Sequence, residues 1–197
     1  LWGAPQSFFY PFRGDDYFQD WRYVPDLEPG DENDYLTDRL TDRALEIIDT
    51  VSDQPFYLNL WYHTVHTPIE GKPELVKKFR DKAASSQKHT NPDYAAMVAS
   101  LDENVGRVLR KLEDKGLAQR TLVVFFSDNG GFINACKLHP GVPVTSNAPL
   151  RSGKGSLYEG GVRVPLIVRW PGVTPEGSVC EEPVTSCDLL PTLATIL

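Results

Sequence analysis

Two neighbouring polar residues stand where a long apolar run ends. Asp128 and Asn129 follow the run 121–126 and precede two glycines. A carboxylate and an amide oxygen are hard ligands that suit Ca²⁺ or Mg²⁺ and do not suit a thiophilic metal. Asp-Asn-Gly is also ordinary turn chemistry, so the motif alone has two interpretations.

Two basic side chains could contact an anionic substrate. His66 precedes Thr67 and Pro68, where it could donate to an anion, act as a general acid, or only form a hydrogen bond within a loop. Lys154 lies between two glycines, where it could present a positive charge to a tetrahedral oxyanion. The run around Lys154 lacks the upstream glycine of the G-x-x-x-x-G-K-[ST] phosphate-binding motif. Each of these signals is weak by itself.

An α/β framework must position these residues. Apolar spacing and helix-start signals predict helices for four segments: 34–51, 73–82, 91–115 and 186–197. Aromatic or continuous apolar runs predict strands for three: 56–62, 121–126 and 162–170. Ligands of an open parallel α/β sheet bind outside the carboxyl ends of its strands. The ends of the first two strands, near His66 and Asp128, are therefore the candidate positions for a site.

Composition excludes several classes of protein. The 197 residues are 41% hydrophobic, which argues against wholesale disorder, and the net charge of −7 disfavours a nucleic-acid partner. No apolar run approaches the length of about 18 residues that a transmembrane helix needs. The three cysteines form no C-x-x-C pair, and they are either free thiols or include a Cys180–Cys187 pair. Residues 1–33 are expected to form an irregular, aromatic-rich loop segment.

Taken together, these segments resemble the type I sulfatases, and among them most closely the bacterial arylsulfatase-A-like enzymes. The similarity covers residues 34–197, in the order found in that family. It is carried by five stretches: 35–42, 62–68, 121–131, 146–165 and 188–192.

This resemblance implies an α/β, alkaline-phosphatase-like fold in which a mixed, mostly parallel sheet lies between helices. It implies that Asp128 and Asn129 are two of the ligands of one Ca²⁺ ion. Lys154 and His66 match the catalytic lysine and histidine that contact the sulfate group. The implied substrate is a sulfated small molecule or carbohydrate, and the expected location is periplasmic or extracellular.

Asn129 also separates two branches of the superfamily. Two-metal relatives carry a histidine after the aspartate, whereas an amide oxygen at Asn129 favours a single hard cation.

Several parts of the family pattern are absent from these 197 residues. There is no C/S-x-P/A-x-R motif, from which the family makes its formylglycine nucleophile. The Asp-Asp pair of the family's first strand, which by resemblance supplies the other Ca²⁺ ligands, is absent as well. We therefore expect the chain to be an internal part of a sulfatase catalytic domain, inactive alone. Such a chain should have an incomplete sheet, an open metal site and exposed apolar surface.

Two alternatives stay open from the sequence. One is a phosphodiesterase or phosphonate hydrolase of the same superfamily, which would use Asp128, Asn129 and Lys154 with another nucleophile. The other is a sulfate-binding pseudo-enzyme without catalytic activity.

Overall fold

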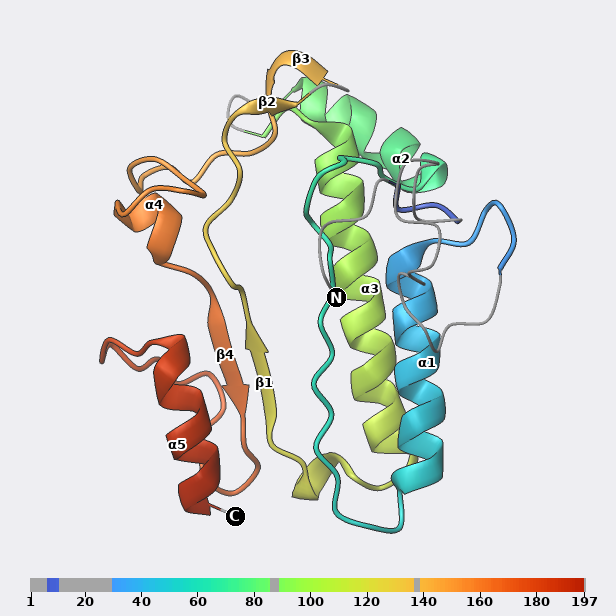
Figure 1. Ribbon diagram of the computed structural model, residues 1–197, viewed down its shortest axis with the longest axis vertical. Coiled ribbons are helices and arrows are strands. Elements are labelled where there is room, and N and C mark those ends of the chain that lie inside the picture. The colour runs from blue at the N-terminus through green and yellow to red at the C-terminus, as the bar shows by residue number, and fades with distance from the viewer. Residues whose placement is uncertain (1–6, 11–29, 86–88, 137–138, 197) are drawn as a thin grey trace, which may run out of the picture.

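The computed structural model describes residues 7–10, 30–85, 89–136 and 139–196 (Figure 1). Its helices are α1 (Leu36–Val51), α2 (Pro73–Ala84), α3 (Pro92–Asp114), the short 3₁₀ helix η1 (Ala118–Arg120), α4 (Glu159–Val162) and α5 (Ser186–Ile196). Its strands are β1 (Val123–Phe126), β2 (Ala135–Cys136), β3 (His139–Pro143) and β4 (Leu166–Arg169). Within these described ranges, no helix combines the length and the apolar character needed to cross a membrane.

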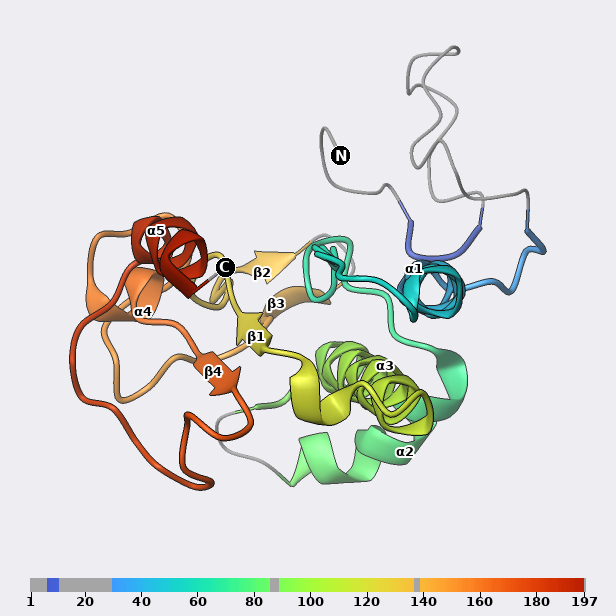
Figure 2. The ribbon, with the colours of Figure 1, turned by 90° about the horizontal axis from the view of Figure 1, so that it is seen from below.

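Three of the predicted helices lie together on one side of the molecule. α3 packs against both α1 and α2, and Figure 2 shows this group apart from β1, β4 and α5. α3 begins as predicted, because the Asn91 side chain accepts a hydrogen bond from the Tyr94 amide at 3.0 Å and Pro92 occupies the first turn. It ends before Gly116, whose φ of +65° is the left-handed conformation that closes many helices.

The strand predicted for 121–126 forms as β1, but its pairing differs from the expectation. β1 pairs with β4 in antiparallel register, with Val123 opposite Arg169 and Phe126 opposite Leu166. The parallel sheet expected from the continuous apolar run is therefore not present among the described strands, where β2 and β3 also pair antiparallel. Apolar character reports burial of a strand and carries no information about the direction of its neighbour.

The strand predicted for 56–62 is not formed. In the described segment 55–72 no residue pairs as a strand, yet exposure alternates from Phe56 to Tyr62, with Tyr57 and Trp61 facing solvent. Alternation of this kind belongs to an extended backbone. A strand also needs a hydrogen-bonded partner, and the described residues supply none beside this segment. The aromatic pattern therefore predicted the conformation correctly and the pairing wrongly.

Two hydrophobic clusters hold the described residues together. The first cluster joins Phe8, which lies in the short described stretch 7–10, to α1, α3 and two connecting segments. Its members are Phe8, Tyr35, Leu36, Ile69, Met97 and Val144. The second closes the opposite end of α1 and α3, and its members are Ile48, Leu112, Leu117 and Ala118. Both clusters contain α1 and α3 residues, so the helical group is the best-packed part of the structure.

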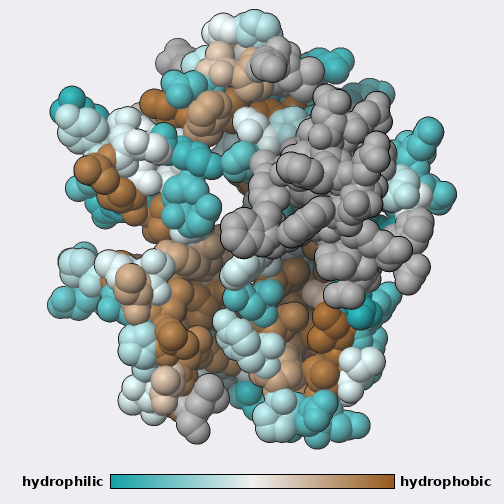
Figure 3. Space-filling view, viewed as in Figure 1, coloured by the Kyte–Doolittle hydropathy of each residue, from teal (hydrophilic) through white to brown (hydrophobic). Residues whose placement is uncertain are grey.

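The opposite side of the molecule exposes apolar side chains, as expected for this chain. α5 has no buried residue, and Leu190 on it is 75% exposed, while Ile167 on β4 is 62% exposed. Figure 3 shows hydrophobic surface gathered at the lower left, where Figure 1 places β4 and α5. The β1–β4 sheet has two strands. The three cysteines are free thiols, so Cys180 and Cys187 are not paired.

Candidate functional site

The end of β1 turns sharply and presents two oxygen-bearing side chains. The Ser127 amide donates to the Pro165 carbonyl at 3.3 Å, which carries the pairing with β4 one residue past the strand. The Ser127 hydroxyl donates to the Asn129 carbonyl at 3.0 Å and closes the turn. Asp128 is exposed and Asn129 is half-buried. Their oxygens can therefore reach a cation at the surface of the strand end.

Glycines pack the strand end directly against a second segment. The Gly130 amide donates to the Gly161 carbonyl at 2.9 Å. A Cβ atom added at Gly130 would overlap the Gly160 carbonyl, and one added at Gly160 would overlap the Ser152 carbonyl. The two Gly-Gly pairs of the sequence thus allow backbone-to-backbone contact that no side chain permits.

The loop that carries Lys154 lies against this strand end. The Lys154 amide donates to the Gly131 carbonyl at 3.1 Å, while the Lys154 residue is exposed. The Arg151 guanidinium stacks on the Tyr158 ring at 3.8 Å from its centroid, and the Gly160 amide donates to the Arg151 carbonyl at 2.9 Å. These contacts close the base of the loop and leave the lysine free to extend from it.

His66 is exposed on a different connecting segment, and its hydrogen bond determines its tautomer. Its Nδ1 lies 2.8 Å from the Thr67 carbonyl oxygen. Since a carbonyl oxygen only accepts, Nδ1 must carry the hydrogen. The Nε2 atom is then the one available to a substrate, as an acceptor in the neutral ring and as a donor when the ring is protonated.

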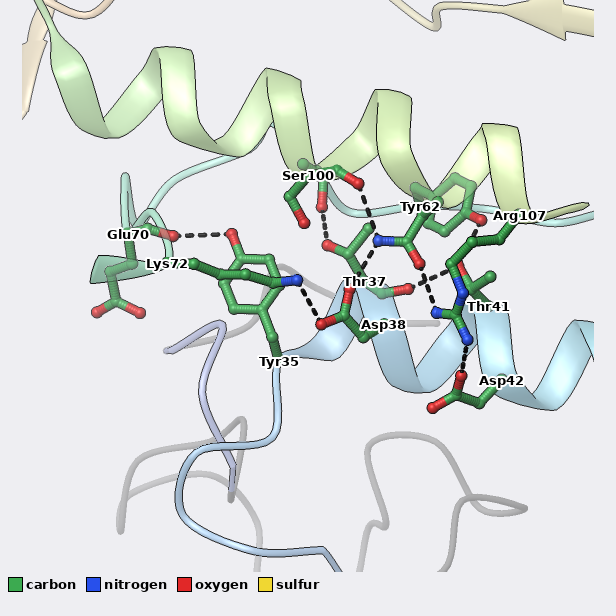
Figure 4. Close-up of polar contacts among 12 residues, drawn as sticks. Tyr35, Thr37, Asp38, Thr41, Asp42, Tyr62, Glu70, Lys72, Ser100 and Arg107 are labelled. Carbon is green, nitrogen blue, oxygen red and sulfur yellow. Dashed lines mark hydrogen bonds and ion pairs between the residues drawn. The ribbon is translucent and has the colours of Figure 1, made fainter. Parts of the chain in front are cut away.

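Helix α1 holds the segment on both sides of His66 (Figure 4). Thr37 hydrogen bonds to Thr64 through their hydroxyls, and the Thr41 hydroxyl lies 2.7 Å from the Tyr62 hydroxyl. Farther along, the Tyr35 hydroxyl donates to the Glu70 carbonyl at 2.8 Å. Contacts at residues 62, 64 and 70 leave His66 in a short span between anchored positions.

A buried polar network continues from these contacts into α3. Asp38 accepts from Lys72 at 2.5 Å, as Figure 4 shows, and from the Asn104 side-chain amide at 2.7 Å. The Arg107 guanidinium donates to the Asn104 carbonyl oxygen at 3.0 Å and pairs with Asp42. This network fixes α1 against α3 and, through Lys72, the end of the histidine segment.

Burial changes the titration of several groups around this network. Burial, with the nearby carboxylates of Asp38, Glu70 and Asp93, raises the pKa of Tyr35 far above its usual range. Burial also raises the pKa of Tyr62. Burial lowers the pKa of His63, and the nearby charge of His66 lowers it further. The two tyrosines are therefore hydrogen-bonding groups and not acids here, and His63 is neutral at pH 7.

The structure unites some of the predicted site residues and leaves one apart. Asp128, Asn129 and Lys154 lie on segments that are hydrogen-bonded to each other. His66 lies on a separate segment, which is linked to the others through the hydrophobic core. Its neighbour Val65 packs on the first hydrophobic cluster, and so does Phe132, which follows Gly131. Among the described residues no three His, Cys, Asp or Glu side chains gather where they could hold a metal. Asp128 and Asn129 supply hard oxygen donors of the kind that Ca²⁺ or Mg²⁺ binds, and by themselves they are two donors.

Three contributors to the site were not identified as such from sequence. Asn147 bonds the strand end to the lysine loop, and Thr37 with Thr64 anchors the histidine segment. The signals for Asn147 were its place in the stretch 146–165, which carries the family resemblance, and an amide side chain of the kind that bonds to nearby backbone. Within the aromatic-rich segment 1–33, Tyr10 packs on the first cluster. Trp2 and Trp21 lie outside the described residues.

Comparison with known proteins agrees on one family. The family model described as Sulfatase matches residues 1–197. The "Sulfatase" of Formosa agariphila is 43% identical over 173 residues, which cover 82% of this chain and 30% of that protein. The steryl-sulfatase of Rattus norvegicus is 34% identical over 98% of this chain and 32% of its own length.

Comparison with solved structures gives a similar result. The crystal structure of Ps i-CgsB in complex with k-i-k-neocarrahexaose matches with a TM-score of 0.74 and 34% sequence identity, over 87% of this chain and 36% of the other. The chain spans about a third of the length of these relatives.

Proposed function

This chain belongs to the sulfatase family, and we propose that it supplies the lysine, the histidine and part of the cation site of an enzyme that hydrolyses sulfate esters. The family membership makes sulfate ester hydrolysis the expected general activity. One structural observation supports the assignment of this activity to particular residues. The Lys154 amide is bonded to the Gly131 carbonyl at 3.1 Å, so the lysine loop lies beside the Asp128–Asn129 turn.

Lys154 is proposed to bind the sulfate group. Its ammonium would donate hydrogen bonds to the sulfate oxygens, and its charge would stabilise the negative charge that these oxygens and the departing alcohol share during the reaction. The exposure of Lys154 supports this role because the side chain is not consumed by an internal ion pair of the described loop.

His66 is proposed to assist departure of the alcohol. With the Nδ1 hydrogen directed at the Thr67 carbonyl, Nε2 of the protonated ring is the atom that would donate its proton to the ester oxygen as the bond to sulfur breaks, which leaves the ring neutral. The anchoring of residues 62, 64 and 70 to α1 supports this role, because a general acid must be held within hydrogen-bond reach of its target.

Asp128 and Asn129 are proposed to hold a Ca²⁺ ion together with ligands from outside the described residues. Such an ion would polarise a sulfate oxygen and orient the nucleophile. We further propose that the nucleophile, a formylglycine by resemblance to the family, comes from outside these 197 residues, which contain no C/S-x-P/A-x-R motif. The chain alone is accordingly expected to be inactive.

The proposed substrate class is a sulfated carbohydrate. The support is the likeness to Ps i-CgsB, which was crystallised with k-i-k-neocarrahexaose. A shallow pocket beside Asn147 is lined by side chains that include Ile133, Thr145 and Ser146. The Ser146 hydroxyl next to apolar surface suits the edge and face of a sugar ring, and we assign this pocket to the part of the substrate beyond the sulfate group.

Sulfate release by the intact enzyme tests the proposal. Purified enzyme should release sulfate from an aryl sulfate and from sulfated galactan oligosaccharides, and a chelator should abolish the activity. Lys154→Ala should lower kcat/KM about 10²- to 10³-fold, as loss of a charge-stabilising donor does. Lys77→Ala removes an exposed lysine on α2 and serves as the control.

Other results would reject the proposal in distinct ways. Hydrolysis of phosphate diesters or phosphonates in preference to sulfate esters would establish the related hydrolase instead. Sulfate binding without turnover, in an intact protein that lacks the C/S-x-P/A-x-R motif, would establish a pseudo-enzyme. Turnover by the isolated 197-residue chain would contradict the assignment of the nucleophile to another segment.

A further inference from the structure

Asn147 joins the segment with the proposed cation ligands to the segment with Lys154. Its Oδ1 accepts from the Gly131 amide at 3.2 Å, and its Nδ2 donates to the carbonyls of Gly131 at 3.0 Å and Ser152 at 3.1 Å. Gly131 comes two residues after Asn129, and Ser152 comes two residues before Lys154. One side chain thus bonds to the main chain on both sides of the candidate site.

The main chain around Asn147 has little freedom to take another arrangement. Ser152 has a φ of +67°, a left-handed conformation that a residue other than glycine adopts only when its surroundings hold it there. The bond from Asn147 to the Ser152 carbonyl is such a restraint. A Cβ atom at Gly153 would overlap the Gly131 carbonyl and lie 2.8 Å from the Asn147 Nδ2. The loop is therefore shaped around this amide group.

The same carbonyl connects Asn147 to Lys154. The Gly131 oxygen accepts both from the Asn147 Nδ2 at 3.0 Å and from the Lys154 amide at 3.1 Å. Removal of the Asn147 amide would free the Ser152 carbonyl and loosen Gly131, which are the two points that place the Lys154 backbone relative to Asp128 and Asn129.

We propose that Asn147 is a positioning residue, which acts on sulfate ester hydrolysis through Lys154, because both ends of its amide group are bonded to the main chain. This inference rests on the proposed function of Lys154. A lysine stabilises developing charge only when its ammonium is already in place, and a displacement of about 1 Å at such a site can cost about 100-fold in rate. The backbone of Lys154 is what Asn147 holds.

Three variants separate the hydrogen bonds from the volume of the side chain. Asn147→Ala removes all three bonds. Asn147→Asp has nearly the same shape and keeps the acceptor for the Gly131 amide, but it sets a carboxylate oxygen against two carbonyl oxygens. Asn134→Ala is the matched control: Asn134 is an exposed asparagine of the same connection, and its carbonyl accepts from the Val144 amide at 3.2 Å.

Kinetics of the intact enzyme on an aryl sulfate test the coupling to Lys154. Asn147→Ala and Asn147→Asp should lower kcat/KM by about 10- to 100-fold, the range seen when an outer residue that orients a ligand is lost. Asn134→Ala should leave it unchanged. In a Lys154→Ala background, Asn147→Ala should change kcat/KM by less than about threefold, because residues that act as a unit are not additive. Full additivity of the two substitutions would overturn the proposal.

Hydrogen exchange measured by mass spectrometry tests the positioning without any activity. Peptides that contain the Lys154 amide should exchange faster in both Asn147 variants and at the original rate in Asn134→Ala. Unchanged exchange in the Asn147 variants overturns the inference even if the enzyme is a sulfatase. Faster exchange in a protein that releases no sulfate supports the positioning role of Asn147 while the proposed function fails.

Discussion

At the scale of single residues, the candidate site depends on groups that act through the backbone. Gly130 and Gly160 allow two segments to touch, and Asn147 bonds them together. Lys154 is exposed on one of these segments, and His66 is exposed on a separate one. The proposed roles of both residues follow from side-chain type and motif, whereas the groups that support Lys154 are visible only as contacts.

The first residue-scale prediction concerns Gly130. Gly130→Ala should destabilise the fold by at least about 1–3 kcal/mol, the usual cost of overpacking, because the added methyl group meets the Gly160 carbonyl and not a side chain that can move. Thermal unfolding measures the loss. Gly106→Ala is the control: its methyl group would lie 3.3 Å from the flexible end of Arg110. This helix-interior change should stabilise α3 by about 0.5–1 kcal/mol. Equal effects of the two substitutions would contradict the close packing of the glycine pairs.

The second residue-scale prediction concerns His63. Burial, and then the charge of His66, lowers the pKa of His63 in the folded protein. Below the usual histidine pKa of about 6.5, the unfolded chain therefore binds more protons than the folded one, and stability falls as pH falls. His63→Gln should flatten the dependence of the unfolding free energy on pH between about 7 and 5. Denaturant titrations at several pH values would show this, and parallel curves for the two proteins would refute it.

At the scale of elements, the contact between α1 and α3 positions the histidine segment. The Asp38–Asn104 pair lies between the helices, and Asn104 is 1% exposed. α1 then reaches the connecting segment through Thr37, Thr41 and Tyr35. A helix pair with a polar seam thus supports a loop that has no strand partner of its own within the described residues.

This seam leads to a prediction for Asn104. Asn104→Ala should cost about 1–3 kcal/mol of stability, because the substitution removes a buried side chain and takes one donor from the half-buried Asp38 carboxylate. The double variant with Asp38→Ala should be less destabilised than the sum of the single variants, since the two residues share one interaction. Denaturant unfolding of the four proteins measures the coupling. Asp102→Ala, an exposed change on the same helix, should stay within about 0.5 kcal/mol of the parent. Strict additivity for Asn104 and Asp38 would show that their bond is not coupled to stability.

At the scale of the whole molecule, packing is uneven. α1 and α3 are joined by two hydrophobic clusters, whereas none of the described residues of α5 is buried and the β1–β4 sheet has two strands. The chain also spans about a third of the length of its relatives. Large exposed apolar surface is unusual on a monomer, and it marks contact with another part of a protein or with a partner.

This unevenness predicts that one substitution will have different effects in two contexts. In the 197-residue chain, Leu190→Ala should change stability by less than about 0.5 kcal/mol, because Leu190 is 75% exposed. In the intact enzyme, where we expect this face to be covered, it should cost about 2–5 kcal/mol. Ile48→Ala, at a residue that is 0% exposed, should cost about 2–5 kcal/mol in both. A small effect of Leu190→Ala in both proteins would show that α5 faces solvent throughout.

The sequence by itself determined the family and the main helices, and it supplied the predictions for the chemistry of the site. The predicted helices 34–51, 73–82 and 91–115 form as α1, α2 and α3, because their periodicity and caps are local signals. The fold class and family followed from motifs read in order, and the comparisons confirm both. The roles of His66, Asp128, Asn129 and Lys154 were inferred from residue type and motif, and they stay predictions.

Only the tertiary structure decided which segments meet. It gave β1 an antiparallel partner, left 56–62 unpaired, and placed Asn147 between the strand end and the lysine loop. Strand pairing and side-chain bonds to distant backbone join residues far apart in the chain, so no local pattern encodes them. Residue types and motifs therefore supply a prediction of the site chemistry residue by residue, but they do not predict the contacts that hold these residues together.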